Sequence, residues 1–315
     1  MTPVLRKQTV LTERQRLQVS AMLAAAAATD SVAALSEQAV LLVDRRAAHF
    51  VVDIDDDTVG YANIADGRDG EPAMAEIVVH PDYRRQQIGT QLARAIFGSR
   101  PEVQMWAHGD LPGAVALART LGMEVTRELL QLRRDLGGLP AVRVPDGVQL
   151  RTYAGPADDA ELLRVNNAAF DWHPEQGGWS QAQIDERTGA DWFDPAGLFL
   201  AFDAVAAEGV GRSADSARLL GFHWTKIHAA GSDAQPLGEV YIVGVDPAAQ
   251  GRGLGHFLTL AGLRYLAGKG LAQVQLYVEG DNHSALKTYE RLGFARYAVD
   301  VAYGIVGAAE GDHPI

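Results

Sequence analysis

A glycine-rich stretch between an apolar strand-like run and an apolar helical pattern is the first candidate for chemistry. The run Glu239–Val245 precedes it, Gln250-Gly251-Arg252-Gly253-Leu254-Gly255 forms it, and the helical pattern follows over 256–266. Such a turn leaves backbone N–H groups free at the positive end of a helix dipole, and glycine lets an anion approach the backbone closely. We therefore expect residues 250–255, called the glycine loop below, to bind a pyrophosphate.

Residue types at fixed positions separate the known phosphate loops. A dinucleotide fingerprint fails, because counting from Gly251 or Gly253 puts His256 or Leu258 at its third glycine position, and the Gly-Lys-Ser/Thr of a P-loop is absent. The pattern Gln/Arg-x-x-Gly-x-Gly does fit, and it resembles the acetyl-CoA loop of the GNAT N-acetyltransferases. An ordinary glycine-rich turn between strand and helix is the alternative that this loop alone leaves open.

Acetyl transfer to an amine needs a group that removes a proton from the ammonium and one that protonates the departing thiolate. Glu239 begins the strand that leads to the glycine loop, and we expect it to be the general base. Tyr289 lies near the end of a predicted helix, and its phenol suits a general acid. A solvated strand-end carboxylate and a core tyrosine are the plainer interpretations of these two residues.

The chain contains an internal repeat. His80-Pro81 and Gly89 match Asp246-Pro247 and Gly255 at an offset of 166, and Leu121-Gly122 matches Leu292-Gly293 at 171. Two motifs in the same order at nearly the same spacing indicate a tandem duplication of one α/β unit. The difference between the offsets predicts a short insertion in the intervening helix or its exit loop.

The repeat predicts that only the second copy is catalytic. At these offsets Glu239 falls on Ala73 and Tyr289 on Ala118, and Gln87 stands where Gly253 stands. The first copy thus lacks both the base and the acid, and its phosphate loop is imperfect.

Composition limits the class of protein. With 315 residues we expect two domains, 1–140 and 148–315, joined by a turn-rich linker at 141–147. A net charge of −12 opposes nucleic-acid binding, and the absence of cysteine excludes disulfides, thiolate metal sites and a cysteine nucleophile. No apolar run is long enough for a membrane span. We expect a cytoplasmic monomer with no metal.

Apolar runs and turn residues predict the elements. We expect helix over 1–30 and strands at 40–44, 49–53 and 59–64 in the first copy. In the second copy we expect strands at 148–152, 198–202 and 219–226, with helices at 157–170 and 181–188. The fold class is therefore α/β (α+β), with two tandem domains that each have a mixed central sheet flanked by helices.

Further motifs make the resemblance closer than the GNAT superfamily. The chain resembles the mycothiol synthase family of bacterial tandem GNAT acetyltransferases over essentially its whole length. The motifs are Pro145-Asp146-Gly147-Val148, 151–155, 164–170, 173–179, Trp192-Phe193-Asp194-Pro195, 220–226, Gly238-Glu239-Val240-Tyr241, Leu276-Tyr277-Val278-Glu279 and Asp281-Asn282.

The resemblance implies transfer of acetyl from acetyl-CoA to the cysteinyl amine of a glucosaminyl-inositol conjugate, by direct attack in a ternary complex. It implies acceptor contacts at Glu37, Glu186, Lys226 and Glu239. The implied coenzyme contacts in the second copy are Val243, Gly244, Val245, Gln250, Gly251, Arg252, Gly253, Leu254, Gly255, His256, Tyr277, Asn282, His283, Ser284, Ala285, Leu286 and Lys287. Those in the first copy are Val78, Val79, His80, Gln86, Gln87, Ile88, Gly89, Thr90 and Gln91.

Two other functions stay open on the sequence. The chain could acetylate another amine, such as a protein N-terminus or an aminoglycoside, or it could be a non-catalytic acetyl-CoA-sensing module. The presence of Glu239 and Tyr289 opposes the second alternative.

Overall fold

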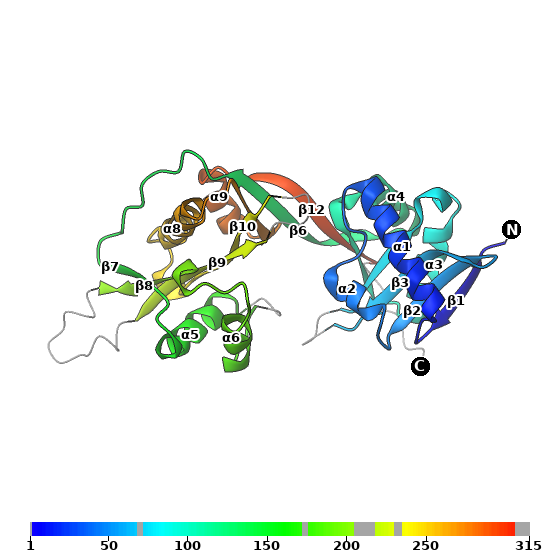
Figure 1. The fold of residues 1–315 in the computed structure, drawn as a ribbon, viewed down its shortest axis with the longest axis horizontal. Coiled ribbons are helices and arrows are strands. Elements are labelled where there is room, and N and C mark those ends of the chain that lie inside the picture. Colours follow the sequence, from blue (N-terminus) through cyan, green and yellow to red (C-terminus); the bar gives the residue numbers. More distant parts are fainter. Residues whose placement is uncertain (1, 68–71, 172–175, 205–217, 230–234, 306–315) are drawn as a thin grey trace, which may run out of the picture. The chain divides into compact units, whose positions relative to one another are not determined.

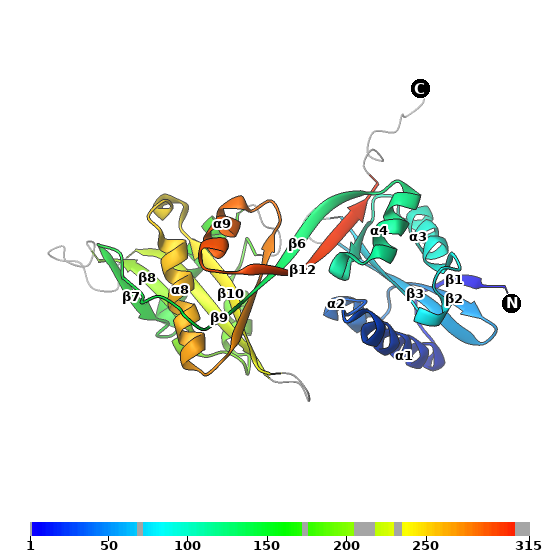
Figure 2. The same cartoon turned by 90° about the horizontal axis from the view of Figure 1, so that it is seen from above.

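The computed structural model describes residues 2–67, 72–171, 176–204, 218–229 and 235–305 (Figure 1). The chain divides into two compact units. Unit 1 comprises Met1–Leu129 and Ala298–Ile315, and unit 2 comprises Leu130–Tyr297. Each unit is a mixed sheet with helices on both faces, as the α/β prediction requires (Figures 1 and 2). None of the helices in the described ranges is long and apolar enough to cross a membrane.

Unit 1 orders its strands β1-β2-β3-β4-β5, followed by the unit 1 parts of β12 and β6. Strands β4 and β5 pair in parallel. The pairs β1–β2, β2–β3, β3–β4 and β5–β12 are antiparallel. Its elements are β1 (Val4–Gln8), α1 (Glu13–Asp30), α2 (Glu37–Leu42), β2 (Ala48–Ile54), β3 (Asp57–Ala65), β4 (Met74–Val79), η1 (Pro81–Tyr83), α3 (Ile88–Ser99), β5 (Gln104–Ala107), η2 (His108–Asp110), α4 (Pro112–Leu121) and the start of β6 (Glu124–Asp135).

Unit 2 orders its strands β7-β8-β9-β10-β11, with the end of β6 beside β11. Helices α5 and α6 cover one face of this sheet, and α8 and α9 cover the other (Figures 1 and 2). Its elements are β7 (Val148–Thr152), η3 (Pro156–Asp158), α5 (Asp159–Ala169), α6 (Gln181–Thr188), η4 (Pro195–Gly197), β8 (Leu198–Asp203), β9 (Leu219–His228), β10 (Leu237–Val245), η6 (Pro247–Ala249), α8 (Leu254–Gly268), β11 (Gln273–Glu279), α9 (His283–Arg291) and the start of β12 (Ala295–Gly304).

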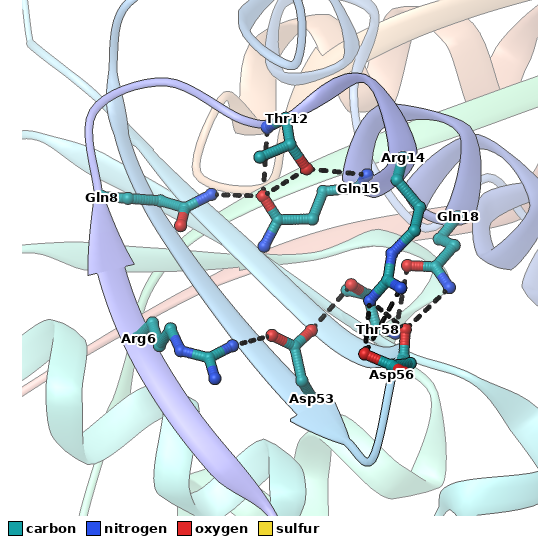
Figure 3. A network of polar contacts seen from close by, with 9 residues as sticks. All are labelled: Arg6, Gln8, Thr12, Arg14, Gln15, Gln18, Asp53, Asp56 and Thr58. Carbon is teal, nitrogen blue, oxygen red and sulfur yellow. Dashed lines mark hydrogen bonds and ion pairs between the residues drawn. The ribbon is translucent and has the colours of Figure 1, made fainter.

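The prediction of one helix over residues 1–30 is wrong at its beginning, where β1 pairs antiparallel with β2. Helix α1 begins after Thr12, whose hydroxyl accepts from the Gln15 N–H, while the Gln15 side chain accepts from the Thr12 N–H (Figure 3). Gln8 at the end of β1 donates to the same Gln15 oxygen at 2.8 Å. This capping box separates the strand from the helix.

The predicted strand at 40–44 is also wrong, because residues 40–42 belong to α2 and Val43 is the residue at which the helix ends. Ser36 begins the helix by accepting from the Ala39 N–H at 3.1 Å. A run of four apolar residues cannot by itself distinguish strand from helix. The cap residue before the run decides between them here.

Ser36 is held in turn by a buried charge cluster. Its N–H and hydroxyl both donate to Glu76 at 2.6 Å. His108 lies between Glu76 and Asp300 of β12, at 3.0 and 3.2 Å. Burial alone would lower the pKa of His108, but hydrogen bonds to Asp300 and Glu76 raise it to about 9. A charged imidazole therefore connects α2, β4 and β12 at neutral pH.

The two units exchange strands, so their limits differ from the predicted domains 1–140 and 148–315. The last seven residues of β12 belong to unit 1, where Val301, Ala302 and Tyr303 pair with β5. The end of β6, from Leu130, belongs to unit 2 beside β11. A strand has the same residue pattern whichever sheet it joins, so the sequence could not indicate the exchange.

The predicted insertion is present in the structure. Helix α3 has 12 residues and its counterpart α8 has 15, so part of the difference in offset lies within the helix.

Replacing His108 by Ala should destabilise the protein by about 3–5 kcal/mol at neutral pH, because two carboxylates lose the cation between them. The raised pKa makes the contribution of His108 complete below about pH 6.5 and removes it as pH rises through about 9. Denaturant unfolding across this pH range measures both effects. Asp66→Asn, which breaks an exposed pair with Arg100, is the control and should cost about 1 kcal/mol or less. Equal losses in the two variants would contradict the cluster's role.

A fragment of residues 130–297 should fold better than one of 141–297, because the shorter fragment exposes the β11 edge that β6 covers. We expect a cooperative thermal transition, measured by circular dichroism, only for the longer fragment. Equivalent transitions in both fragments would show that the exchanged strand is dispensable.

Candidate active site

The predicted base lies where two parallel strands of unit 2 part. β10 and β11 pair only near their beginnings, with Gly238 opposite Val274 and Glu239 opposite Gln275, although both strands continue for several residues. On its other edge β10 remains paired with β9. The two parallel strands therefore separate beyond Glu239, and we call the space between them the strand opening.

Hydrogen bonds to β9 show which backbone groups of β10 face the strand opening. The Asp246 N–H donates to the Leu220 carbonyl at 2.9 Å, and alternate residues back along the strand, beginning with Gly244, face β9 as well. The N–H and C=O groups of Val243 and Val245 consequently point to the opposite edge. These two predicted coenzyme contacts offer backbone groups to a ligand in the strand opening.

A β-bulge marks the point where the strands part. The register with β9 shifts between Val240, opposite Thr225, and Ile242, opposite Trp224, so Tyr241 is the extra residue. A bulge bends its strand and increases the local twist. Its position beside Glu239 accounts for the separation of β10 from β11.

At the other end of β10 the glycine loop connects η6 to α8. Gly251 and Gly253 have φ angles of 79° and 74°, a left-handed conformation suited to glycine. A Cβ at either position would meet no protein atom within 4 Å, so this side of the loop is open. No side chain caps α8, and the first-turn N–H groups of Leu254, Gly255 and His256 are available to an anion.

A buried carboxylate fixes the start of the loop. Asp246 is 3% exposed and accepts from Arg164 at 2.6 Å, from Arg218 at 2.9 Å and from the Ala248 N–H at 2.9 Å. Burial alone would raise the pKa of Asp246, but these donors hold it below its ordinary value. The carboxylate therefore stays charged and holds the loop in place.

Glu239 is a buried residue rather than a solvated strand-end carboxylate. It is 8% exposed, and its Oε2 accepts from Nε2 of His228 and from Nε2 of Gln275, the latter at 3.4 Å. Lys226 is its cross-strand neighbour on β9. A carboxylate held at the beginning of the strand opening can take a proton from a group bound there.

Tyr289 of α9 packs on the core of unit 2, with its ring 5.7 Å from that of Phe294. Burial raises the pKa of its phenol to about 12, so it keeps its proton at neutral pH. Its hydroxyl has no hydrogen-bond partner among the residues that the structure describes. The proton is thus free for a ligand, as a general acid requires.

The predicted acceptor residues do not all lie together. Lys226 lies over two aromatic rings, 4.8 Å from the centre of Trp192 and 5.4 Å from that of Tyr241. Glu186 on α6 is exposed, 3.8 Å from Arg187, which donates to the Tyr241 hydroxyl at 3.1 Å. Lys226 and Glu239 are therefore close to each other. Glu186 lies on α6, the helix whose Arg187 contacts Tyr241 beside Lys226.

Glu37 lies in unit 1, exposed on the first turn of α2, and its contact with the acceptor stays a prediction. Residues 172–175 of the motif at 173–179 lie outside the described residues.

The remaining predicted coenzyme residues of unit 2 lie on β11 and on the first turns of α9. Tyr277 is 47% exposed, and its hydroxyl is 3.1 Å from Gln131. Asn282 begins α9 by accepting from the Ala285 N–H at 3.1 Å, and His283 to Lys287 follow on the helix. Their role toward a coenzyme stays a prediction.

The register of unit 1 corrects one position of the repeat. Gln104 of β5 corresponds to Gln275, and its partner on β4 is Met74, so Met74 and not Ala73 is the counterpart of Glu239. The offset of 166 does not apply to residues before Tyr241. The bulge adds one residue to β10, and the pairing of β4 with β3 has no such shift. The inference that unit 1 lacks the base is unchanged.

The counterpart of the acid is as predicted. The Met123 N–H donates to the Ala118 carbonyl at 2.9 Å, and the Phe294 N–H donates to the Tyr289 carbonyl at 3.0 Å. These equivalent bonds close the ends of α4 and α9 and align Ala118 with Tyr289.

The loop of unit 1 keeps the backbone of the glycine loop without its glycines. Arg85 and Gln87 stand at the positions of Gly251 and Gly253, with φ angles of 63° and 64°. Left-handed backbone is less favourable for these residues by about 1–2 kcal/mol each. The loop that contains the predicted contacts at 86–91 therefore has the same left-handed backbone as the glycine loop. It differs in that the side chains of Arg85 and Gln87 extend from it.

Sequence reasoning missed three residues at the site. His228 was not among the predicted site residues, yet it contacts Glu239. Gln275 and the bulge at Tyr241 have no pattern in sequence that would distinguish them. The spacing of His228, two residues after Lys226 and therefore on the same side of β9, is the one signal that could have found it.

Comparison with known proteins identifies the class that this fold and site define. The model of the acetyltransferase (GNAT) family matches residues 18–123 and 166–294, one segment in each half of the chain. The chain therefore belongs to the GNAT acetyltransferase family.

Relatives place the chain more narrowly. It is 60% identical to the mycothiol acetyltransferase of Gordonia bronchialis over 90% of this chain and 89% of the relative. It is 57% identical to that of Rhodococcus erythropolis, over 91% and 94%, and 51% identical to that of Mycolicibacterium smegmatis, over 94% and 97%. Within the GNAT family, the chain belongs with the mycothiol acetyltransferases.

Solved structures share the fold. A GCN5-related N-acetyltransferase from Sphaerobacter thermophilus has a TM-score of 0.68 at 20% identity, covering 95% of this chain and 94% of its own. A tandem GNAT protein from the clavulanic acid biosynthesis pathway has a TM-score of 0.62 at 21% identity, with 96% and 98% covered. These likenesses support the tandem GNAT fold.

Gly253→Ala should raise the KM for acetyl-CoA by roughly tenfold and leave kcat nearly unchanged. The added Cβ strains a left-handed residue by about 1–2 kcal/mol and occupies the open side of the loop. Steady-state kinetics at varied acetyl-CoA measure the effect. Gly268→Ala, at the last residue of α8 where a Cβ also meets nothing, is the control and should keep the wild-type KM. A wild-type KM for both variants would contradict a coenzyme role for the loop.

Proposed function

We propose that this chain transfers the acetyl group of acetyl-CoA to the cysteinyl amine of 1D-myo-inositol 2-(L-cysteinylamino)-2-deoxy-glucopyranoside, the last step of mycothiol biosynthesis. Its membership of the mycothiol acetyltransferases supports this substrate. The observation that carries the chemistry is the position of Glu239, buried where β10 and β11 part, on the same strand that ends at the glycine loop.

The described groups of unit 2 fit acetyl-CoA. About 20 Å of strand separates Glu239 from the end of β10, a distance that an extended pantetheine arm can span. The first-turn N–H groups of α8 would hold the pyrophosphate, and Val243 and Val245 would hydrogen-bond the amides of the arm. The thioester would then lie in the strand opening near Glu239. Backbone N–H groups would thus bind the anionic pyrophosphate although the net charge of the chain is −12.

Glu239 serves as the general base in this proposal. An α-amine has an ordinary pKa of about 7.7–8.0 and is largely ammonium at neutral pH. The buried carboxylate takes a proton from it, and the free amine attacks the thioester carbonyl directly. With no cysteine in the chain, no acetyl-cysteine intermediate can form.

Tyr289 serves as the general acid. Its phenol is fully protonated at neutral pH, since burial raises its pKa to about 12. The thiolate of CoA would leave into the same apolar surroundings, which raise its pKa as well and make it a stronger acceptor of the proton. The phenol donates its proton as the carbon–sulfur bond breaks.

Unit 1 has no catalytic role in this proposal, because Met74 and Ala118 replace the base and the acid. Binding of acetyl-CoA to its loop, the monomeric state and the cytoplasmic location stay predictions.

The proposed acceptor is tested by acetyl-CoA consumption with the cysteinyl-glucosaminyl-inositol conjugate beside cysteine, glucosamine and a short peptide. We expect kcat/KM for the conjugate to exceed the others by at least 100-fold, because Lys226 and Glu186 can reach groups that the smaller amines lack. Equal or higher rates with the peptide would retain the mechanism and reject the acceptor. Absence of turnover with every amine would support the acetyl-CoA-sensing alternative.

Glu239→Gln and Tyr289→Phe should each lower kcat by about 10²–10⁴-fold, the usual contribution of a general base or acid. Single-turnover kinetics with the conjugate measure the chemical step directly. Glu290→Gln, the exposed neighbour of Tyr289 on α9, is the control and should keep wild-type kcat. Wild-type kcat in Glu239→Gln or in Tyr289→Phe would remove that residue from its role.

A further inference from the structure

The two oxygens of the Glu239 carboxylate have different surroundings. Oε2 accepts from Nε2 of His228 and from Nε2 of Gln275. Oε1 has no hydrogen-bond partner among the residues that the structure describes. One oxygen is therefore held by two donors, and the other keeps its lone pairs free.

The orientation of the Gln275 amide is fixed by its other contacts. Its Oε1 accepts from Nε2 of Gln131 at 2.7 Å and from Nη2 of Arg133 at 3.2 Å. Arginine can only donate, so the oxygen of Gln275 must face Arg133. Its Nε2 must then face Glu239, 3.4 Å from Oε2. Gln275 is 6% exposed, so its amide is largely shielded from solvent.

His228 holds the same oxygen from the other strand. Its Nε2 donates to the carboxylate whether the ring is neutral or charged, because a carboxylate can only accept. The His228 side chain is 37% exposed, against 11% for that of Glu239. His228 is therefore the more exposed of the two donors to this carboxylate, and Gln275 is the more buried one.

We propose that Gln275 and His228 are positioning residues that fix Oε2 of Glu239, so that Oε1 is the atom that takes the proton of the acceptor ammonium. This inference rests on the proposed role of Glu239 as the base. The nitrogen–hydrogen bond breaks, the bond from Oε1 to hydrogen forms, and the nitrogen keeps the electron pair that attacks the thioester. Tyr289 gives its proton to the thiolate and regains one from the second nitrogen–hydrogen bond, so that turnover releases to water only the proton held on Oε1.

The donors act on the carboxylate alone. Without them the carboxylate rotates among several orientations, and only some direct a free oxygen toward the strand opening. Loss of a fixed geometry at a reacting atom costs about 10²-fold in rate. The glycine loop lies at the far end of β10, so acetyl-CoA binding is not expected to change.

Gln275→Met removes the amide donor in a side chain of similar size, and Gln273→Met is its matched control on the same strand, where the glutamine is exposed. We expect kcat to fall about 10–100-fold in Gln275→Met, with the KM for acetyl-CoA unchanged, and to stay at the wild-type value in Gln273→Met. Thermal unfolding of both variants shows whether the protein remains folded.

His228→Leu and His228→Gln test the second donor. The leucine variant should lose about 10-fold or more in kcat, and the glutamine variant should recover most of it, because its amide nitrogen can still donate to Oε2. Full loss in both variants, or wild-type kcat in His228→Leu, would overturn the role of His228.

Failure of this inference is distinguishable from failure of the proposed function. If Glu239→Gln loses kcat while Gln275→Met keeps it, Glu239 is the base and the positioning role is rejected. If Glu239→Gln keeps kcat, the base assignment is rejected, and the positioning role with it. A rise in the acetyl-CoA KM that parallels a loss of thermal stability in Gln275→Met would show that Gln275 only supports the fold.

Discussion

Parallel strands that separate inside a sheet leave backbone N–H and C=O groups without partners, and such groups are costly unless a ligand or water satisfies them. Unit 2 contains this arrangement at β10 and β11. The bulge at Tyr241 bends β10, the backbone groups of Val243 and Val245 then face the strand opening, and Glu239 lies at the last pairing of β10 with β11. The proposed binding groups and the proposed base thus depend on one local break in the sheet.

The two units show which parts of this arrangement are separable. Unit 1 keeps the left-handed loop before α3, even with Arg85 and Gln87 in place of glycine. It lacks the bulge, and its β4 and β5 stay paired for one residue more than β10 and β11. Loop shape persists because the strand and helix on either side impose it. The bulge and the carboxylate beside it belong to the proposed chemistry of unit 2.

Much of this fold could be predicted from the sequence, where local signals are strong. The strand 148–152 and the helix 181–188 have the predicted bounds, because a turn-rich linker precedes the first and Ser180 caps the second. Residue spacing alone predicted the repeat, the glycine loop and the correspondence between Ala118 of the first copy and Tyr289 of the second. β1 was missed because it is a short, largely exposed edge strand with two basic residues, and α2 because an apolar run has no helical period over so short a length. The contacts of His228 and Gln275 with Glu239 depend on strand register, which the sequence does not state.

The exchange of strands gives a structural role to the half of the chain for which no catalytic role is proposed. Residues 130–135 of β6 precede the linker and so belong to the first repeat, yet they cover the β11 edge beside the proposed catalytic residues. Residues 298–304 of β12, which follow the second repeat, complete the sheet of unit 1. A deletion that removed either copy at the linker would leave the survivor with an open edge. Point substitutions at Met74 or Ala118 leave both sheets complete, whereas loss of either repeat at the linker would not.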